Sequence, residues 1–210
     1  MRAGPAPLTL VSLGRLPESY ALMSPDPIIR IEKALSEAAS GVAEEYIRLP
    51  IDGGRAVYRE RLYCYELYHQ LRCVLGDDFD YSIGGEIDKS GHPRMRGPGV
   101  SGTKPDLLVH GPGYMERNLL VIEVKPAICY RRNKITKDLQ TLTGYRGPGE
   151  YKHAWYLIYG GDKRYMDRFR LICEGIAHEE ADPPIDLRGI QLFWHPGSNR
   201  TLTPVPWQAA

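Results

Sequence analysis

Two short segments place acidic and basic side chains at the ends of apolar runs. The first is KPD at positions 104–106, which opens the run LLV, and the second is EVK at positions 123–125, which closes the run LLVIEVK. Because side chains alternate between the faces of a strand, Glu123 and Lys125 point one way and Val124 the other. The intervening segment GPGYMERN favours a chain reversal. A hairpin brings Asp106 near Glu123 and Lys125, and such a group can hold a divalent cation and position a water molecule.

These residues resemble the signature of the PD-(D/E)xK nuclease superfamily, with Pro105-Asp106 as the PD and Glu123-Val124-Lys125 as the ExK. Sixteen residues, 107–122, separate the two acids, which is a separation that such hairpins use. The resemblance covers about residues 60–160. It implies hydrolysis of phosphodiester bonds by direct in-line attack of water, with Mg²⁺ as the cofactor and Mn²⁺ as a substitute. The implied products have a 5′ phosphate and a 3′ hydroxyl.

The resemblance also implies roles for individual residues. Asp106 and Glu123 are expected to bind the metal together with the backbone carbonyl of Val124. Lys125 is expected to orient the water, to stabilise its deprotonated form or to contact the scissile phosphate. Gln140 resembles a polar residue that relatives place at the edge of the active site. Its spacing to Tyr145 is one residue longer than the QxxxY spacing of one nuclease branch, so an exposed helix glutamine is the alternative.

Many members of the superfamily have an accessory acid on the first helix of the core, which binds the metal directly or through water. Glu66 is the expected catalytic and metal-binding acid here because it lies among several tyrosines, which indicates an interior-facing position. The alternative is a surface glutamate bonded to Gln70, four residues further on. The acids that compete with Glu66 for this role are Glu60, Glu86 and Asp88.

The elements that must position these residues follow from apolar periodicity and turn signals. Helices are predicted from Ile28, where Gly41 weakens but does not forbid continuation to about residue 49, and over about 55–75, 133–146 and 164–177. Strands are predicted over 81–89, 104–110, 118–125, 151–161 and 189–197. The central order is helix, strand, strand, strand, helix, strand. It predicts an α/β fold with a mixed central sheet flanked by helices, and the resemblance implies a restriction-endonuclease-like core.

The bulk composition predicts an ordinary globular protein. The chain has 210 residues, of which 42% are hydrophobic and 25% charged. Prolines in residues 1–27 indicate an extended arm, and residues 28–210 are expected to form a single nuclease-like domain. The four cysteines have no CxxC spacing, which argues against a zinc site. No apolar run reaches the roughly 18 residues that span a bilayer, and we expect no membrane association and a cytoplasmic location.

The charge pattern indicates a local rather than a global attraction for nucleic acid. The net charge is only +1, yet positions 125–152 contain seven basic residues and two acidic ones. Such an excess suits a phosphate backbone, whereas a solvated face is the alternative. The basic residues expected to contact nucleic acid are Arg94, Arg96, Arg131, Arg132, Lys134 and Lys137.

The expected substrate is DNA, cut by an endonuclease in restriction, repair or antiphage defence. The sequence contains no recognisable reading head, so sequence choice would come from loops, a targeting protein subunit or a homo-oligomer. Two alternatives stay open. One is a non-catalytic subunit of the same fold that binds nucleic acid or is purely structural, and the other is an enzyme that acts on RNA or on nucleotides.

Overall fold

A six-stranded mixed sheet lies at the centre of the computed structural model, which describes residues 26–89, 91, 93, 95–97, 99–179 and 181–208. Its strands follow one another in chain order, and β1-β2-β3 form an antiparallel half. β3, β4 and β5 are parallel, and β6 returns antiparallel to β5. The strands are β1 (Ser82–Gly84), β2 (Leu107–His110), β3 (Asn118–Pro126), β4 (His153–Tyr159), β5 (Ile190–His195) and β6 (Thr203–Val205).

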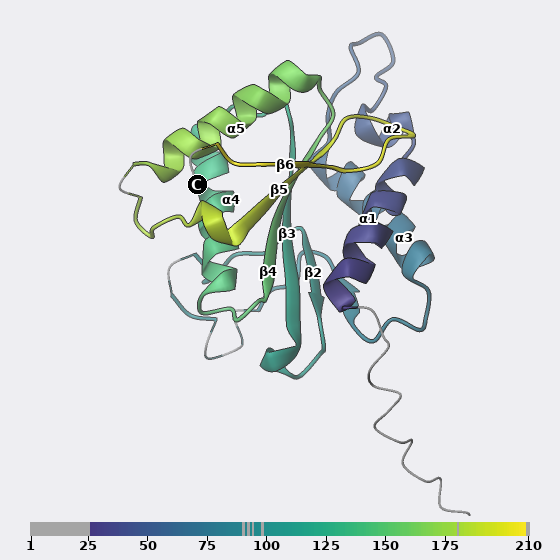
Figure 1. Cartoon of the computed structure of the whole chain (residues 1–210). Coiled ribbons are helices and arrows are strands. Elements are labelled where there is room, and N and C mark those ends of the chain that lie inside the picture. The colour runs from purple at the N-terminus through teal and green to yellow at the C-terminus, as the bar shows by residue number, and fades with distance from the viewer. Residues whose placement is uncertain are drawn as a thin grey trace, which may run out of the picture.

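Helices cover both faces of this sheet. α1 and α3 pack on one face, and α4 and α5 pack on the other (Figure 1). The helices are α1 (Pro27–Gly41), α2 (Glu44–Ile47), α3 (Glu60–Leu75), α4 (Arg132–Arg146) and α5 (Lys163–Ala177), with 3-10 turns η2 (Met115–Arg117) and η3 (Leu187–Gly189). The predicted α/β fold is confirmed, and α3-β1-β2-β3-α4-β4 is the predicted order of elements.

β3 is the central strand that positions the chemistry. Its residues are buried from Asn118 to Lys125, as an apolar run covered on both faces predicts. Leu120, Ile122 and Val124 belong to the core beneath α1 and α3, whereas Val121 belongs to the core beneath α4 and α5. Strand alternation therefore directs Glu123 and Lys125 to the α4 face.

Several predicted boundaries were wrong. The first helix ends at Gly41 because Val42 takes extended angles (φ −71°, ψ 118°), and α2 is a separate short helix. α3 begins at Glu60 rather than near residue 55, since Val57 pairs with Leu49 in an isolated bridge. β1 is much shorter than the predicted 81–89. β6 was not predicted, because its Pro204 weakens any strand signal and suits only an edge strand.

The N-terminal boundary of the described structure falls at α1. Residues 1–25 of the predicted arm, and Arg94, lie outside the described residues. Asp26 caps α1 by accepting a hydrogen bond from the amide of Ile28 (3.1 Å), and Pro27 occupies the first turn, where its missing amide hydrogen costs nothing. Among the described helices, none combines the length and the hydropathy that a membrane crossing requires.

Candidate active site

The predicted hairpin is present, and it joins the PD and ExK segments. Leu107 pairs with Ile122, which ends the ladder between β2 and β3, because β2 begins immediately after Pro105-Asp106. Beyond the last backbone pair, the side chain of Asp106 continues the contact between the two segments. Its Oδ2 accepts a hydrogen bond from the amide of Val124 at 2.7 Å. The carboxyl groups of Asp106 and Glu123 lie close enough to share a hydrogen bond when one of them is protonated. Two acids thus meet at one end of the hairpin.

Lys125 lies between acids from two helices that cover opposite faces of the sheet. Its Nζ is 2.9 Å from Oε2 of Glu60, the first residue of α3, and 3.1 Å from Oδ2 of Asp138 in α4. The residue is only 6% exposed. A buried ammonium group needs such partners, and these two hold it beside the Asp106–Glu123 pair.

Asp138 is a site residue that sequence reasoning missed. It is buried on α4 and accepts a hydrogen bond from the hydroxyl of Tyr156 at 2.8 Å. The signal was available in the helical pattern, because Asp138 shares the apolar stripe of Ile135, Leu139 and Leu142. An acid within such a stripe rarely lies buried without a partner, and the partner here is Lys125.

These side chains line a small cavity of about 240 Å³. Lys134 and Lys137, two of the predicted phosphate contacts, extend from α4 to its wall. The remaining lining residues are Glu60, Thr103, Lys104, Asp106, Glu123, Lys125, Asp138 and Thr141. Four acids and four lysines therefore line the same cavity. The acids suit a metal ion, and the lysines suit a phosphate group at the entrance.

Three acids of this cavity, Asp106, Glu123 and Asp138, have raised pKa values. Burial, followed by the charge of Glu60, raises the pKa of Asp106 to about 6. Burial and the charge of Asp106 raise the pKa of Glu123 well above its usual value. Burial also raises the pKa of Asp138, against the opposing effect of Lys125. Burial by itself would lower the pKa of Lys125, but the charges of Asp138 and Glu60 outweigh it and the pKa is raised.

The donor set fits Mg²⁺. Asp106 and Glu123 present carboxylate oxygens, the ligands that this ion prefers, and one or two carboxylates with retained waters are its usual protein ligands. Both pKa values are raised, chiefly by burial, and a cation bound between the two carboxyl groups would favour their ionised forms. Among the described residues, no group of three or more His, Cys, Asp or Glu side chains is placed so that it could hold a metal ion. Glu60 and Asp138 instead contact Lys125.

Two predicted site residues are not brought to the cavity. Glu66 accepts a hydrogen bond from Gln70 at 2.7 Å, and Gln70 lies against Gly41 at the end of α1. Glu66 lies six positions after Glu60, which places the two on different faces of α3. Gln140 instead donates a hydrogen bond to the carbonyl of Pro183 at 3.1 Å. Glu66 makes the contact that its structural alternative predicts, whereas Gln140 is half-buried and bonded to Pro183 rather than an exposed helix glutamine.

The other competing acids and basic residues are spread over neighbouring surfaces. Glu86 pairs with Arg61 (2.9 Å), and Asp88 lies 3.8 Å from Lys104. Arg132 pairs with Glu179 on the surface, and Arg96 is exposed in the loop before β2. Arg131 lines a separate, larger groove. Of the five predicted nucleic-acid contacts that the structure describes, only Lys134 and Lys137 line the cavity itself.

No protein-family model, curated protein or solved structure matches this chain. The functional interpretation therefore depends on the geometry of the cavity and on the resemblance of its residues to the PD and ExK segments. The geometric part consists of the Asp106–Glu123 contact, the ion pairs of Lys125 and the two lysines of α4.

Proposed function

We propose that this chain is a Mg²⁺-dependent nuclease of the PD-(D/E)xK type that hydrolyses phosphodiester bonds in nucleic acid, with DNA as the first candidate substrate. The observation that supports it best is the contact between the Asp106 and Glu123 carboxyl groups, with Lys125 held beside them in a cavity that Lys134 and Lys137 border. A purely structural ion cluster has no need of two adjoining carboxyl groups whose pKa values are raised by burial.

Asp106 and Glu123 hold the ion in this proposal, and the backbone carbonyl of Val124 is the expected third protein ligand. Bound Mg²⁺ supplies neutralisation of the phosphoryl oxygens and lowers the pKa of a coordinated water. Lys125 stays protonated, because Glu60 and Asp138 favour its charged form. Its ammonium group can donate a hydrogen bond to the attacking water or to the scissile phosphate.

Bond changes at the phosphorus follow from in-line attack. The water oxygen forms the new bond to phosphorus while the bond to the 3′ oxygen breaks, which leaves a 5′ phosphate. The water releases one proton, and the leaving 3′ oxygen takes one from solvent to become a hydroxyl. Lys134 and Lys137 at the mouth of the cavity contact the flanking phosphates.

Glu60 takes the accessory role that the sequence assigned to Glu66. Its Oε2 contacts Lys125, and its charge is the second cause of the raised pKa of Asp106. Glu60 therefore acts on both Lys125 and Asp106. Glu66 instead contacts Gln70 in the described structure. Gln140 has no catalytic role in this proposal, and its hydrogen bond anchors the loop at Pro183.

The biological setting that we propose is restriction, repair or antiphage defence. The chain has a net charge of only +1 and no recognisable reading head. A targeting subunit, or a second copy of the chain, would then choose the sequence to be cut.

Cleavage of plasmid and of single-stranded DNA with Mg²⁺ or Mn²⁺ tests this function. Wild type is expected to cut in a metal-dependent way, and Asp106→Ala and Lys125→Ala are each expected to lose about a thousandfold in rate. Asp167→Ala, an acid in the ion network of α5, is the matched control and should cut like wild type. Metal-independent cutting, or cutting that survives both site variants, would contradict the proposal. Metal-free binding of DNA without any turnover would favour the non-catalytic subunit instead.

A further inference from the structure

A second, larger groove of about 890 Å³ opens beyond the carboxyl ends of the parallel strands. Its floor is formed by residues that end or follow β3, β4 and β5, among them Pro126, Gly160 and Pro196. Ligands of open α/β sheets bind outside the carboxyl ends of the strands. The groove adjoins the candidate active site in the chain, because Pro126 follows Lys125 directly and Tyr58 precedes Glu60 by two residues.

Three tyrosines make the walls of this groove. Tyr130 and Tyr165 lie with their rings nearly parallel, 4° between planes and 6.3 Å between centroids. The guanidinium of Arg168 lies 4.3 Å from the centroid of the Tyr130 ring. Tyr58 belongs to the lining from the segment that precedes α3, and the guanidinium of Arg48 lies 5.6 Å from its ring centroid. Arg48 thus lies over one tyrosine of the groove, and Arg168, which is not among the lining residues, lies over another.

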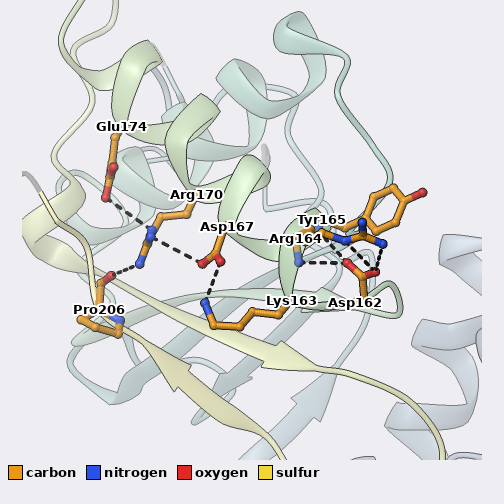
Figure 2. A network of polar contacts seen from close by, with 8 residues as sticks. All are labelled: Asp162, Lys163, Arg164, Tyr165, Asp167, Arg170, Glu174 and Pro206. Carbon is orange, nitrogen blue, oxygen red and sulfur yellow. Dashed lines mark hydrogen bonds and ion pairs between the residues drawn. The ribbon is translucent and has the colours of Figure 1, made fainter.

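Hydrogen bonds fix the backbone at Tyr165 and the ring of Tyr58 in this groove. Figure 2 shows the start of α5, where Asp162 accepts hydrogen bonds from the amides of Arg164 and Tyr165, while the Tyr165 ring points away from the ion network. The Tyr58 hydroxyl accepts a hydrogen bond from the amide of Gly161 at 3.3 Å. A Cβ at Gly160 would lie 2.4 Å from the Tyr58 ring, so this glycine permits the ring to approach the end of β4.

The charge of the groove favours an anionic ligand. Arg48 and Arg131 are exposed at its walls, against the single acid Glu44 among the lining residues. Arg131 is one of the residues that the sequence predicted to contact nucleic acid. A double helix keeps its base faces stacked inside, whereas an unpaired strand can lay its bases on tyrosine rings while its phosphates meet arginines.

We propose that this tyrosine groove, defined by Tyr58, Tyr130, Tyr165, Arg48 and Arg131, binds the unpaired bases of a single-stranded nucleic-acid segment next to the cleavage site. The inference rests on the proposed nuclease function and deepens it, because it assigns a single-stranded substrate or a strand separated from its duplex. Tyr130 and Tyr165 stack on bases, and Arg48 and Arg131 contact the backbone. The strand leaves the groove at Pro126 and reaches the cavity of Asp106 and Glu123.

Binding without cleavage tests the groove independently of catalysis. A fluorescein-labelled oligothymidine of about ten nucleotides, a length that such sites accommodate, is titrated in a metal chelator and followed by anisotropy. Tyr130→Leu and Tyr165→Leu are each expected to weaken its binding about tenfold, because stacking on one ring contributes roughly 1–3 kcal/mol. Tyr130→Phe keeps the ring and should keep the affinity. Tyr114→Leu, at an exposed tyrosine of the β2–β3 turn at the opposite end of the hairpin, should bind like wild type.

The outcomes separate the groove from the proposed function. Unchanged affinity of both leucine variants, an equal loss with a duplex of the same length, or a wild type that does not bind the single strand would each overturn the groove assignment, even if metal-dependent cutting is found. A tyrosine-dependent affinity in a chain that cuts nothing would support the groove and reject the nuclease. Thermal unfolding of each variant shows that lost binding does not come from lost folding, since both rings are partly exposed.

Discussion

The molecule contains two polar networks with opposite electrostatic character. Along α5 and the C-terminal segment, acids and bases are matched: Asp162 pairs with Arg164, Asp167 with Lys163, and Arg170 contacts the carbonyl of Pro206 (Figure 2). The candidate active-site cavity is lined by four acids and four lysines, but Lys125 is the one buried lysine among them and contacts Glu60 and Asp138. The pKa values of Asp162 and Asp167 are lowered, chiefly by hydrogen bonds from Arg164 and Lys163, whereas burial raises those of Asp106, Glu123 and Asp138.

This difference distinguishes ion pairs near the surface from a cavity in which buried acids outnumber the buried base. Where an exposed acid has an exposed base, as Asp162 and Asp167 have, ionisation is easy and the pairs contribute little individually. Where buried acids outnumber bases, the charged form is unfavourable until a cation arrives. The direction of the pKa shifts is therefore a better guide to the site than the presence of ion pairs, which both networks have.

The largest expected contrast is between two lysines. Lys125→Met removes the buried cation that Glu60 and Asp138 contact, and we expect it to lower the free energy of unfolding by about 3 kcal/mol at pH 7.5 without metal. Lys163→Met removes an exposed partner of Asp167 and should change the free energy by less than about 0.5 kcal/mol. Urea denaturation of both variants measures the contrast. Equal losses of unfolding free energy in the two variants would mean that the buried and the exposed lysine contribute alike, which would contradict the comparison.

Asp106→Asn should stabilise the metal-free protein. The pKa of Asp106 is about 6 in the fold and 3.8 without it, so the folded state binds more protons between these values and its stability falls as the pH rises through them. Removing the ionisable group should therefore raise the free energy of unfolding by about 3 kcal/mol at pH 8 and change it little below pH 3.8, where both states are protonated.

Asp167→Asn is the matched variant with the opposite sign. The pKa of Asp167 is lowered in the fold, so its stabilising effect is present at neutral pH and is lost as the pH falls. Denaturation curves in a chelator at pH 8 and at acidic pH should show the first variant gaining stability and the second losing it at pH 8. A loss of stability at pH 8 in Asp106→Asn would contradict the interpretation of the cavity.

Two glutamates of α3 sharpen the comparison further. Glu60→Gln weakens the hold on Lys125 and is expected to slow Mg²⁺-dependent cleavage about 10- to 100-fold, the usual range for a residue that orients a catalytic group. Glu66→Gln should leave the rate unchanged, because its hydrogen bond goes to Gln70. Single-turnover cleavage rates decide between them. A slow Glu66→Gln beside a normal Glu60→Gln would restore the assignment made from the sequence.

The smallest expected effect concerns the hydroxyl that supports Asp138. Tyr156→Phe removes its 2.8 Å hydrogen bond and should lower the free energy of unfolding by about 1 kcal/mol. Tyr165→Phe removes a hydroxyl from a partly exposed ring and should not change it measurably. Thermal denaturation of both variants in a chelator gives the comparison. If Tyr156→Phe leaves the free energy of unfolding unchanged, Lys125 alone satisfies Asp138.

The part of the site that could be predicted lies within one hairpin. Glu123 and Lys125 share a face because strand geometry alternates, and a reversing loop returns the chain beside Asp106. Only neighbouring elements are needed for that inference. Glu66 shows where it stops, because the two acids of this helix, Glu60 and Glu66, looked equivalent and the preference rested on aromatic neighbours. The helix instead turns Glu66 toward Gln70 and α1.

The sequence by itself determined the α/β order of elements, the hairpin and the pairing of its acids, since periodicity and turns are local properties of the chain. The tertiary structure decided that Glu60 and Asp138 meet at Lys125, from helices on opposite faces of the sheet. It also placed Tyr58, Tyr130 and Tyr165 around one groove. Such meetings depend on how helices rotate and pack against a shared strand, and no local pattern specifies that rotation.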